Sequence, residues 1–106
     1  MGAKLPNRRY PRIKLPTGMP IAWESNGRRV VSQVTTIGLG GFFIATSQPP
    51  LVGSVLKLFI DSAGGGIRAR GIVRDSQPGE GMGVEFISMS PEGRAHLQQL
   101  LKRLMC

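Results

Sequence analysis

The chain has 106 residues, a length that suits one domain with a modest hydrophobic core. Hydrophobic residues make up 41% of it, which excludes a disordered protein, and its 15 glycines and 8 prolines indicate many turns between short strands. The formal net charge of +8 favours anionic partners, whether nucleotides, nucleic acid, acidic lipid or acidic protein, and does not choose among them.

The sequence has no feature of a secreted or membrane-spanning protein. Its single cysteine, Cys106, cannot form an internal disulfide, so nothing indicates an oxidising compartment. Residues 1–20 contain no apolar run of the kind found in secretory signals, and no stretch approaches the ~18 apolar residues of a membrane span. We expect a cytoplasmic protein that is a monomer or a weak dimer.

Residues 1–16 form a basic segment that is interrupted by prolines. It carries five cations and no acid: Lys4, Arg8, Arg9, Arg12 and Lys14. Pro6, Pro11 and Pro16 prevent a regular helix. The sequence therefore predicts a flexible N-terminal arm over residues 1–16 and a folded domain over residues 17–106.

The middle of the chain alternates between apolar and polar residues in short runs separated by turn signals. Ser25-Asn26-Gly27 is typical of a hairpin turn, because Asn-Gly tolerates positive φ. About six strands are predicted, over residues 19–24, 28–36, 42–46, 54–60, 67–74 and 82–86. Short antiparallel strands at this spacing predict an all-β small barrel.

The end of the chain changes to a helical period. Ser90-Pro91-Glu92 combines a hydroxyl N-cap, proline at the first helical position and an acid in the first turn. An apolar stripe follows at Leu97, Leu100, Leu101 and Leu104. We expect one C-terminal α-helix over about 90–104, which either packs on the barrel and closes one end or contacts a membrane surface or a partner.

The sequence shows no arrangement of catalytic or metal-binding side chains. The only histidine, His96, lies in the expected helix, the six acids are scattered, and no Cys/His cluster could hold zinc. Gly38-Leu39-Gly40-Gly41 is not a dinucleotide fingerprint, because Phe43 stands at its sixth position and a strand follows. We therefore expect no enzyme activity, no metal and no cofactor.

The run Arg8-Arg9-Tyr10-Pro11-Arg12 is the most informative local feature. Arg8 and Arg12 stand in R-x-x-x-R spacing with Arg9 between them. A guanidinium can bind phosphate oxygens or the O6/N7 edge of guanine with two parallel hydrogen bonds. On its own, however, the segment is better explained as a solvated basic tail or a nonspecific nucleic-acid tether.

A second feature is the glycine-rich connection at residues 36–44, between two predicted strands. Glycines at 38, 40 and 41 permit a tight turn and let an anion or a base approach the backbone N–H groups. The same glycines would also serve a simple tight strand connection.

Taken together, these residues resemble the PilZ domain family. That family has R-x-x-x-R near its N-terminus, then [D/N]-x-S-x-x-G at a strand-to-strand turn, and a split barrel that ends in a G-[V/I]-x-F strand and a helix. Arg8 and Arg12 match the first motif, and Gly83-Val84-Glu85-Phe86 matches the last strand. The second motif departs from the pattern: Thr36 replaces the acid or amide, Gly38 replaces the serine, and Gly41 is kept.

The resemblance implies a bacterial receptor for the second messenger cyclic di-GMP. It assigns ligand binding to two groups of residues: Arg8, Arg9 and Arg12 in the arm, and Thr36, Gly38, Gly40 and Gly41 in the second motif. It also implies that the arm becomes ordered when the ligand binds and that a protein effector reads this change.

Three functions remain open from the sequence. The first is a cyclic di-GMP receptor. The second is a degenerate PilZ-like adaptor that binds a protein and no nucleotide, which Thr36 and Gly38 favour. The third is nonspecific nucleic-acid binding through the net charge. The small aromatic surface for base stacking, limited to Trp23 and Tyr10, disfavours this third function.

Overall fold

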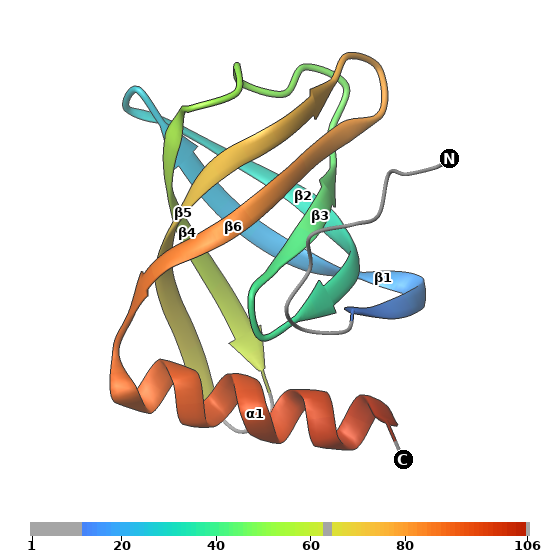
Figure 1. Cartoon of the computed structure of the whole chain (residues 1–106), viewed down its shortest axis with the longest axis vertical. Coiled ribbons are helices and arrows are strands. Elements are labelled where there is room, and N and C mark those ends of the chain that lie inside the picture. Colours follow the sequence, from blue (N-terminus) through green and yellow to red (C-terminus); the bar gives the residue numbers. More distant parts are fainter. Residues whose placement is uncertain (1–11, 63–64, 106) are drawn as a thin grey trace, which may run out of the picture.

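A computed structural model describes residues 12–62 and 65–105 of the chain. Six antiparallel strands form a closed barrel that is followed by one helix (Figure 1). The elements are β1 (Arg12–Ser25), β2 (Arg28–Gly38), β3 (Gly41–Ala45), β4 (Val55–Ser62), β5 (Gly65–Gln77), β6 (Gly81–Met89) and α1 (Pro91–Met105). Around the barrel the strands follow the order β1-β2-β3-β6-β5-β4. The predicted all-β barrel with one C-terminal helix is confirmed.

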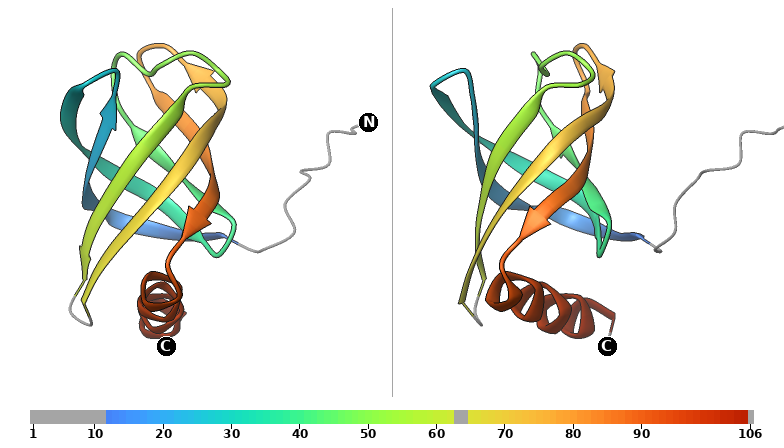
Figure 2. Two further views of the ribbon diagram at one scale, coloured as in Figure 1. Left: turned by 90° about the vertical axis from the view of Figure 1, so that its left-hand side faces the viewer. Right: turned by 60° about the vertical axis from the view of Figure 1, so that its left-hand side comes forward.

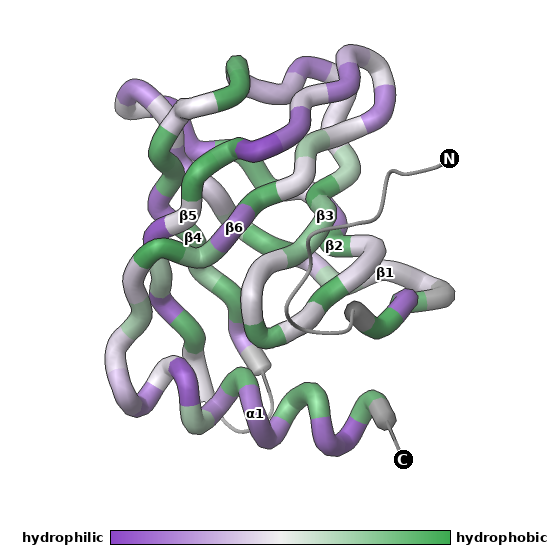
Figure 3. The backbone as a smooth tube through the Cα atoms, viewed as in Figure 1, coloured by the Kyte–Doolittle hydropathy of each residue, from purple (hydrophilic) through white to green (hydrophobic). Residues whose placement is uncertain are grey.

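Alternation along each strand separates the barrel interior from its outer face. In β4, Leu56, Leu58 and Ile60 are buried, whereas Lys57 and Asp61 are exposed. In Figure 3, hydrophobic segments (green) run along the strands of the barrel, and green and purple segments alternate along the C-terminal helix. The side chains that are fully buried include Ile21, Val34, Ile37, Phe42, Ile44, Leu56, Leu58, Ile67, Val73, Met82, Val84 and Leu97.

The β1–β2 hairpin turns where the sequence predicted. Asn26 and Gly27 both have positive φ, at 53° and 79°. A two-residue turn of this kind matches the right-handed twist of the strands that it joins. It sets the pairing of Ser25 with Arg28, and the ladder runs from there toward the start of β1.

Helix α1 lies across one end of the barrel, opposite the loop that joins β3 to β4 (Figures 1 and 2). Ser90 caps it: the backbone N–H of Gly93 donates to Ser90 Oγ at 3.0 Å. Leu97, Leu100 and Leu101 belong to the barrel core. The helix therefore packs on its own barrel, which is the first of the two arrangements that the sequence allowed. No helix within residues 12–62 and 65–105 is long and apolar enough to cross a membrane.

Strand β1 begins earlier than the sequence suggested. It starts at Arg12, so residues 12–16, which we assigned to the arm, belong to this strand, and Arg12, Ile13 and Lys14 pair with β2. Prolines exclude a helix here, but they do not exclude a strand with an interrupted ladder. Pro16 falls where the register shifts, between the pairs Lys14–Thr36 and Met19–Val34. Residues 1–11 lie outside the described part of the chain.

Candidate ligand site

The start of β1 and the end of β2 bring the last residue of the first sequence motif to the second motif. Arg12 pairs with Gly38, and Lys14 pairs with Thr36. The last arginine of the R-x-x-x-R motif therefore has its backbone directly opposite the glycine that replaces the family's serine. Arg8 and Arg9 lie outside the described residues.

A row of paired residues crosses four strands on the outer face of the barrel at this point. We call its three side chains on β1, β2 and β3, which are Lys14, Thr36 and Phe43, the polar row. Ile13 and Ile37 pack on or within the core, so their neighbours Lys14 and Thr36 face outward. Thr36 pairs in turn with Phe43 of β3, and Phe43 pairs with Gly83 of β6. An exposed ammonium, a half-buried hydroxyl and a half-buried aromatic ring are thus placed side by side.

Lys14 and Phe43 were not among the candidates from the sequence. The signal for Lys14 was its position two residues after the end of the R-x-x-x-R motif. That signal was readable only if β1 had been recognised as starting before Pro16. The Phe43 ring packs against β6 at Gly81, where a Cβ atom would stand 2.6 Å from ring carbon Cε2.

The glycines between β2 and β3 have a packing role that the sequence did not reveal. The carbonyl of Gly40 accepts a hydrogen bond from the N–H of Phe86 at 2.9 Å. A Cβ atom on Gly41 would lie only 2.1 Å from the carbonyl oxygen of Val84, so this glycine lets β3 approach β6 closely. The contact of Gly38, Gly40 and Gly41 with a ligand stays a prediction.

An ion pair borders this region on β5 and β6. Gly41 pairs with Glu85, whose Oε1 lies 2.6 Å from Nε of Arg74. Both side chains are exposed, so the pair adds little stability. The cation of Arg74 does, however, neutralise the negative charge of Glu85 next to the region where we expect an anion to bind. Sequence reasoning missed the pair, because a register shift between Val73 and Asp75 decides how β5 meets β6 here.

Other conspicuous residues have structural contacts. Trp23 is buried at 4% exposure, and its Nε1–H donates to Ser32 Oγ at 3.0 Å. His96 has Nδ1 3.0 Å from the carbonyl oxygen of Gly66, at the helix and away from the polar row. In the described ranges, no three His, Cys, Asp or Glu side chains are grouped as metal ligands would be.

In the comparison with protein families, the PilZ domain matches residues 6–103. The chain belongs to the PilZ domain family. The matched range contains both sequence motifs, the whole barrel and most of α1. Among curated proteins, none matches this sequence.

Solved structures of other proteins resemble the chain in fold. The Bacillus subtilis inhibitor of motility MotI/DgrA superposes with a TM-score of 0.75 at 18% identity, covering 95% of this chain and 53% of its own. The Klebsiella pneumoniae MrkH–c-di-GMP complex superposes with a TM-score of 0.74 at 17% identity. That match covers 95% of this chain and 52% of MrkH. The chain thus spans about half the length of these two proteins.

The PilZ domain of Escherichia coli YcgR, solved with c-di-GMP, has nearly the same extent as this chain. Its TM-score is 0.73 at 16% identity, and the match covers 94% of this chain and 92% of the YcgR domain. At this level of identity the likeness establishes the fold.

Proposed function

We propose that this PilZ domain is a non-catalytic receptor for cyclic di-GMP. The observation that supports the proposal is the pairing of Arg12 with Gly38, which brings the last residue of the R-x-x-x-R motif to the glycine-rich connection. Membership of the PilZ family and the c-di-GMP complexes of MrkH and YcgR support it.

The proposed site combines the chemistry that this ligand requires. Arg8, Arg9 and Arg12 supply guanidiniums for its phosphates and guanine edges. Lys14 adds a further cation, and Phe43 offers an aromatic edge or face for a guanine. Thr36 offers a hydroxyl where relatives place an acid or amide, so we expect weaker guanine binding than in a complete motif.

Ligand binding would connect the N-terminal segment to the barrel. Arg8 and Arg9 lie only a few residues before β1, whereas residues 36–41 belong to the barrel itself. A ligand held by both would fix residues 8–12 against the outer face, and we propose that a protein effector reads this change.

The test is calorimetric titration of cyclic di-GMP at about physiological salt, with cyclic GMP and GTP as controls. We expect saturable binding that Arg12→Ala weakens more than tenfold, since one charge-assisted contact is worth about 1.5–3 kcal/mol. Arg94→Ala is the matched control, because Arg94 is exposed on α1 and far along the chain from both motifs. Equal weakening by the two substitutions would show that only net charge matters.

A second function is favoured by one specific observation. Thr36 and Gly38 stand where the family motif has its acid or amide and its hydroxyl, which fits an adaptor that binds a protein and no nucleotide. Flat calorimetric heats, together with an unchanged Tm in excess ligand, would select the adaptor over the receptor.

A further inference from the structure

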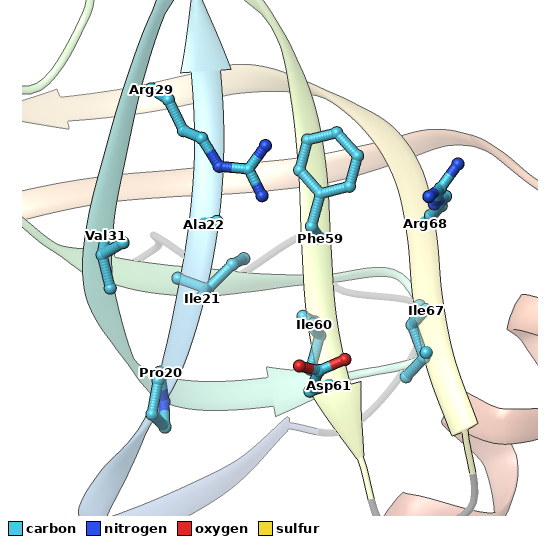
Figure 4. A pocket seen from close by; sticks show the side chains of 11 residues that line it. Pro20, Ile21, Ala22, Arg29, Val31, Phe59, Ile60, Asp61, Ile67 and Arg68 are labelled. Atoms are coloured by element: carbon cyan, nitrogen blue, oxygen red, sulfur yellow. The ribbon is translucent and has the colours of Figure 1, made fainter.

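The barrel closes through a short ladder, which leaves a groove on its outer face. Strand β1 pairs with β4 only where Ala22, Trp23 and Glu24 meet Phe59, Leu58 and Lys57. Continuing the same register would place Pro20 opposite Asp61, but Pro20 has no N–H to donate and the ladder stops. Figure 4 shows β1 and β4 separating below Ala22 and Phe59. A groove of about 470 Å³ opens here.

The upper rim of this groove is built from an aromatic ring and two arginines. The Cζ atom of Arg29 lies 4.7 Å from the centroid of the Phe59 ring, and that of Arg68 lies 5.8 Å from it (Figure 4). Cation–π attraction holds the guanidiniums at the ring and leaves N–H groups available to an anion. Val31, at 70% exposure, adds an apolar surface beside them.

Two further cations stand next to each other on the same sheet face. Lys57 of β4 pairs directly with Arg70 of β5, and both side chains are exposed. Within the described part of the chain neither forms an ion pair. Glu24, which pairs with Lys57 from β1, is bonded to Arg29 instead, at 3.1 Å. Like charges directly opposite each other destabilise a sheet unless an anion lies between them.

A second groove, of about 420 Å³, lies on the other side of Phe59 and includes Lys57, Arg68 and Arg70. We call the surface formed by Arg29, Lys57, Phe59, Arg68 and Arg70 the Phe59 face. It has four cations and is bordered by two acids, Glu24 and Asp61. This surface is separate from the polar row of Lys14, Thr36 and Phe43.

We propose that the Phe59 face binds an extended acidic segment of a partner protein. Its carboxylates would neutralise Lys57, Arg68 and Arg70, and an apolar side chain on the same face of the extended segment, two residues from a carboxylate, would pack on Phe59. Arginine beside an aromatic ring is typical of the residues that dominate protein interfaces. The split between β1 and β4 favours a peptide over nucleic acid, because extended chains bind along strands that lack a sheet partner.

The probe is a fluorescein-labelled hexapeptide, Glu-Ser-Val-Ser-Glu-Ser, which presents Glu, Val and Glu on one face when it is extended. Its binding is followed by fluorescence anisotropy at about 50 mM salt, with Lys-Ser-Val-Ser-Lys-Ser as control. We expect saturable binding of the acidic peptide alone, weakened at least about tenfold by Arg68→Glu. The control is Arg94→Glu, which changes the net charge equally at an exposed position of α1. Equal weakening by both substitutions, or absence of saturable binding to the wild type, would overturn the proposal.

Arg70→Glu gives a sharper test because it moves two readouts in opposite directions. It replaces a like-charge pair with an opposite-charge pair at Lys57, so we expect a Tm higher by about 1–4 °C. The same change removes a cation from the Phe59 face and should weaken the peptide. A stabilised variant that binds the peptide as well as the wild type would contradict the proposal.

Two further titrations separate this inference from its alternatives. A single-stranded oligothymidylate of matched charge should bind less tightly than the peptide; tighter binding that Arg68→Glu abolishes would make this a nucleic-acid face and overturn the proposal. Cyclic di-GMP should bind Arg68→Glu and the wild type alike. Loss of its affinity in Arg68→Glu would mean that the nucleotide, not a peptide, occupies this surface.

Discussion

Gly41 offers the strongest test of the packing between β3 and β6. A Cβ atom there would stand 2.1 Å from the carbonyl oxygen of Val84 and 3.1 Å from Cα of Glu85. Real Cβ atoms essentially never approach closer than 3.0 Å, so Gly41→Ala requires a separation of about 0.9 Å, the difference between the two distances. Both obstructing atoms belong to the backbone, which cannot move aside as a side chain could.

The consequence follows from the neighbouring hydrogen bond. The N–H of Phe86 donates to the carbonyl of Gly40 at 2.9 Å, and the same displacement would lengthen this bond beyond hydrogen-bonding distance. Strain and a lost bond together cost about 1–3 kcal/mol. At roughly 4 °C per kcal/mol for a domain of this size, we expect Tm to fall by about 4–12 °C.

Thermal unfolding followed by circular dichroism measures this change, and Gly83→Ala is its matched control. Gly83 lies on β6, where an added Cβ would meet only the Cβ of Asp75, at an ordinary 3.5 Å. We expect that variant to melt at or slightly above the wild-type temperature, because alanine lowers the entropy of the unfolded chain. If Gly41→Ala melts within about 2 °C of the wild type, the packing role assigned to Gly41 is wrong.

Three other substitutions test separate parts of the molecule. Ser32→Ala removes the acceptor of the buried Trp23 N–H, so the free energy of unfolding should fall by about 1–3 kcal/mol in urea titration followed by tryptophan fluorescence; an unchanged midpoint would refute this. Ser90→Ala removes the cap that binds the N–H of Gly93 and should cost about 0.5–2 kcal/mol, whereas Ser90→Asp should keep most of the stability. Thr36→Asp supplies the carboxylate of the family motif and should tighten cyclic di-GMP about tenfold to a hundredfold by calorimetry; unchanged or weaker binding would exclude Thr36 from the guanine site.

The sequence by itself determined the features that depend on local patterns. The alternation of Leu56, Leu58 and Ile60 specified a half-buried strand, Asn26-Gly27 specified a hairpin, and Ser90-Pro91 specified the start of the helix. Each of these signals lies within a few residues, so it can be read without knowing what the segment packs against. The order of such segments was also enough to indicate the family.

The tertiary structure alone decided the features that depend on pairing between distant residues. It set the start of β1 at Arg12, because β2 supplies hydrogen-bond partners to a segment that prolines make look irregular. It also placed Lys14 and Phe43 beside Thr36, and gathered Arg29 and Arg68 around Phe59. Register and strand order position these side chains, and both follow from how the whole barrel buries its core, which no single segment of the sequence contains.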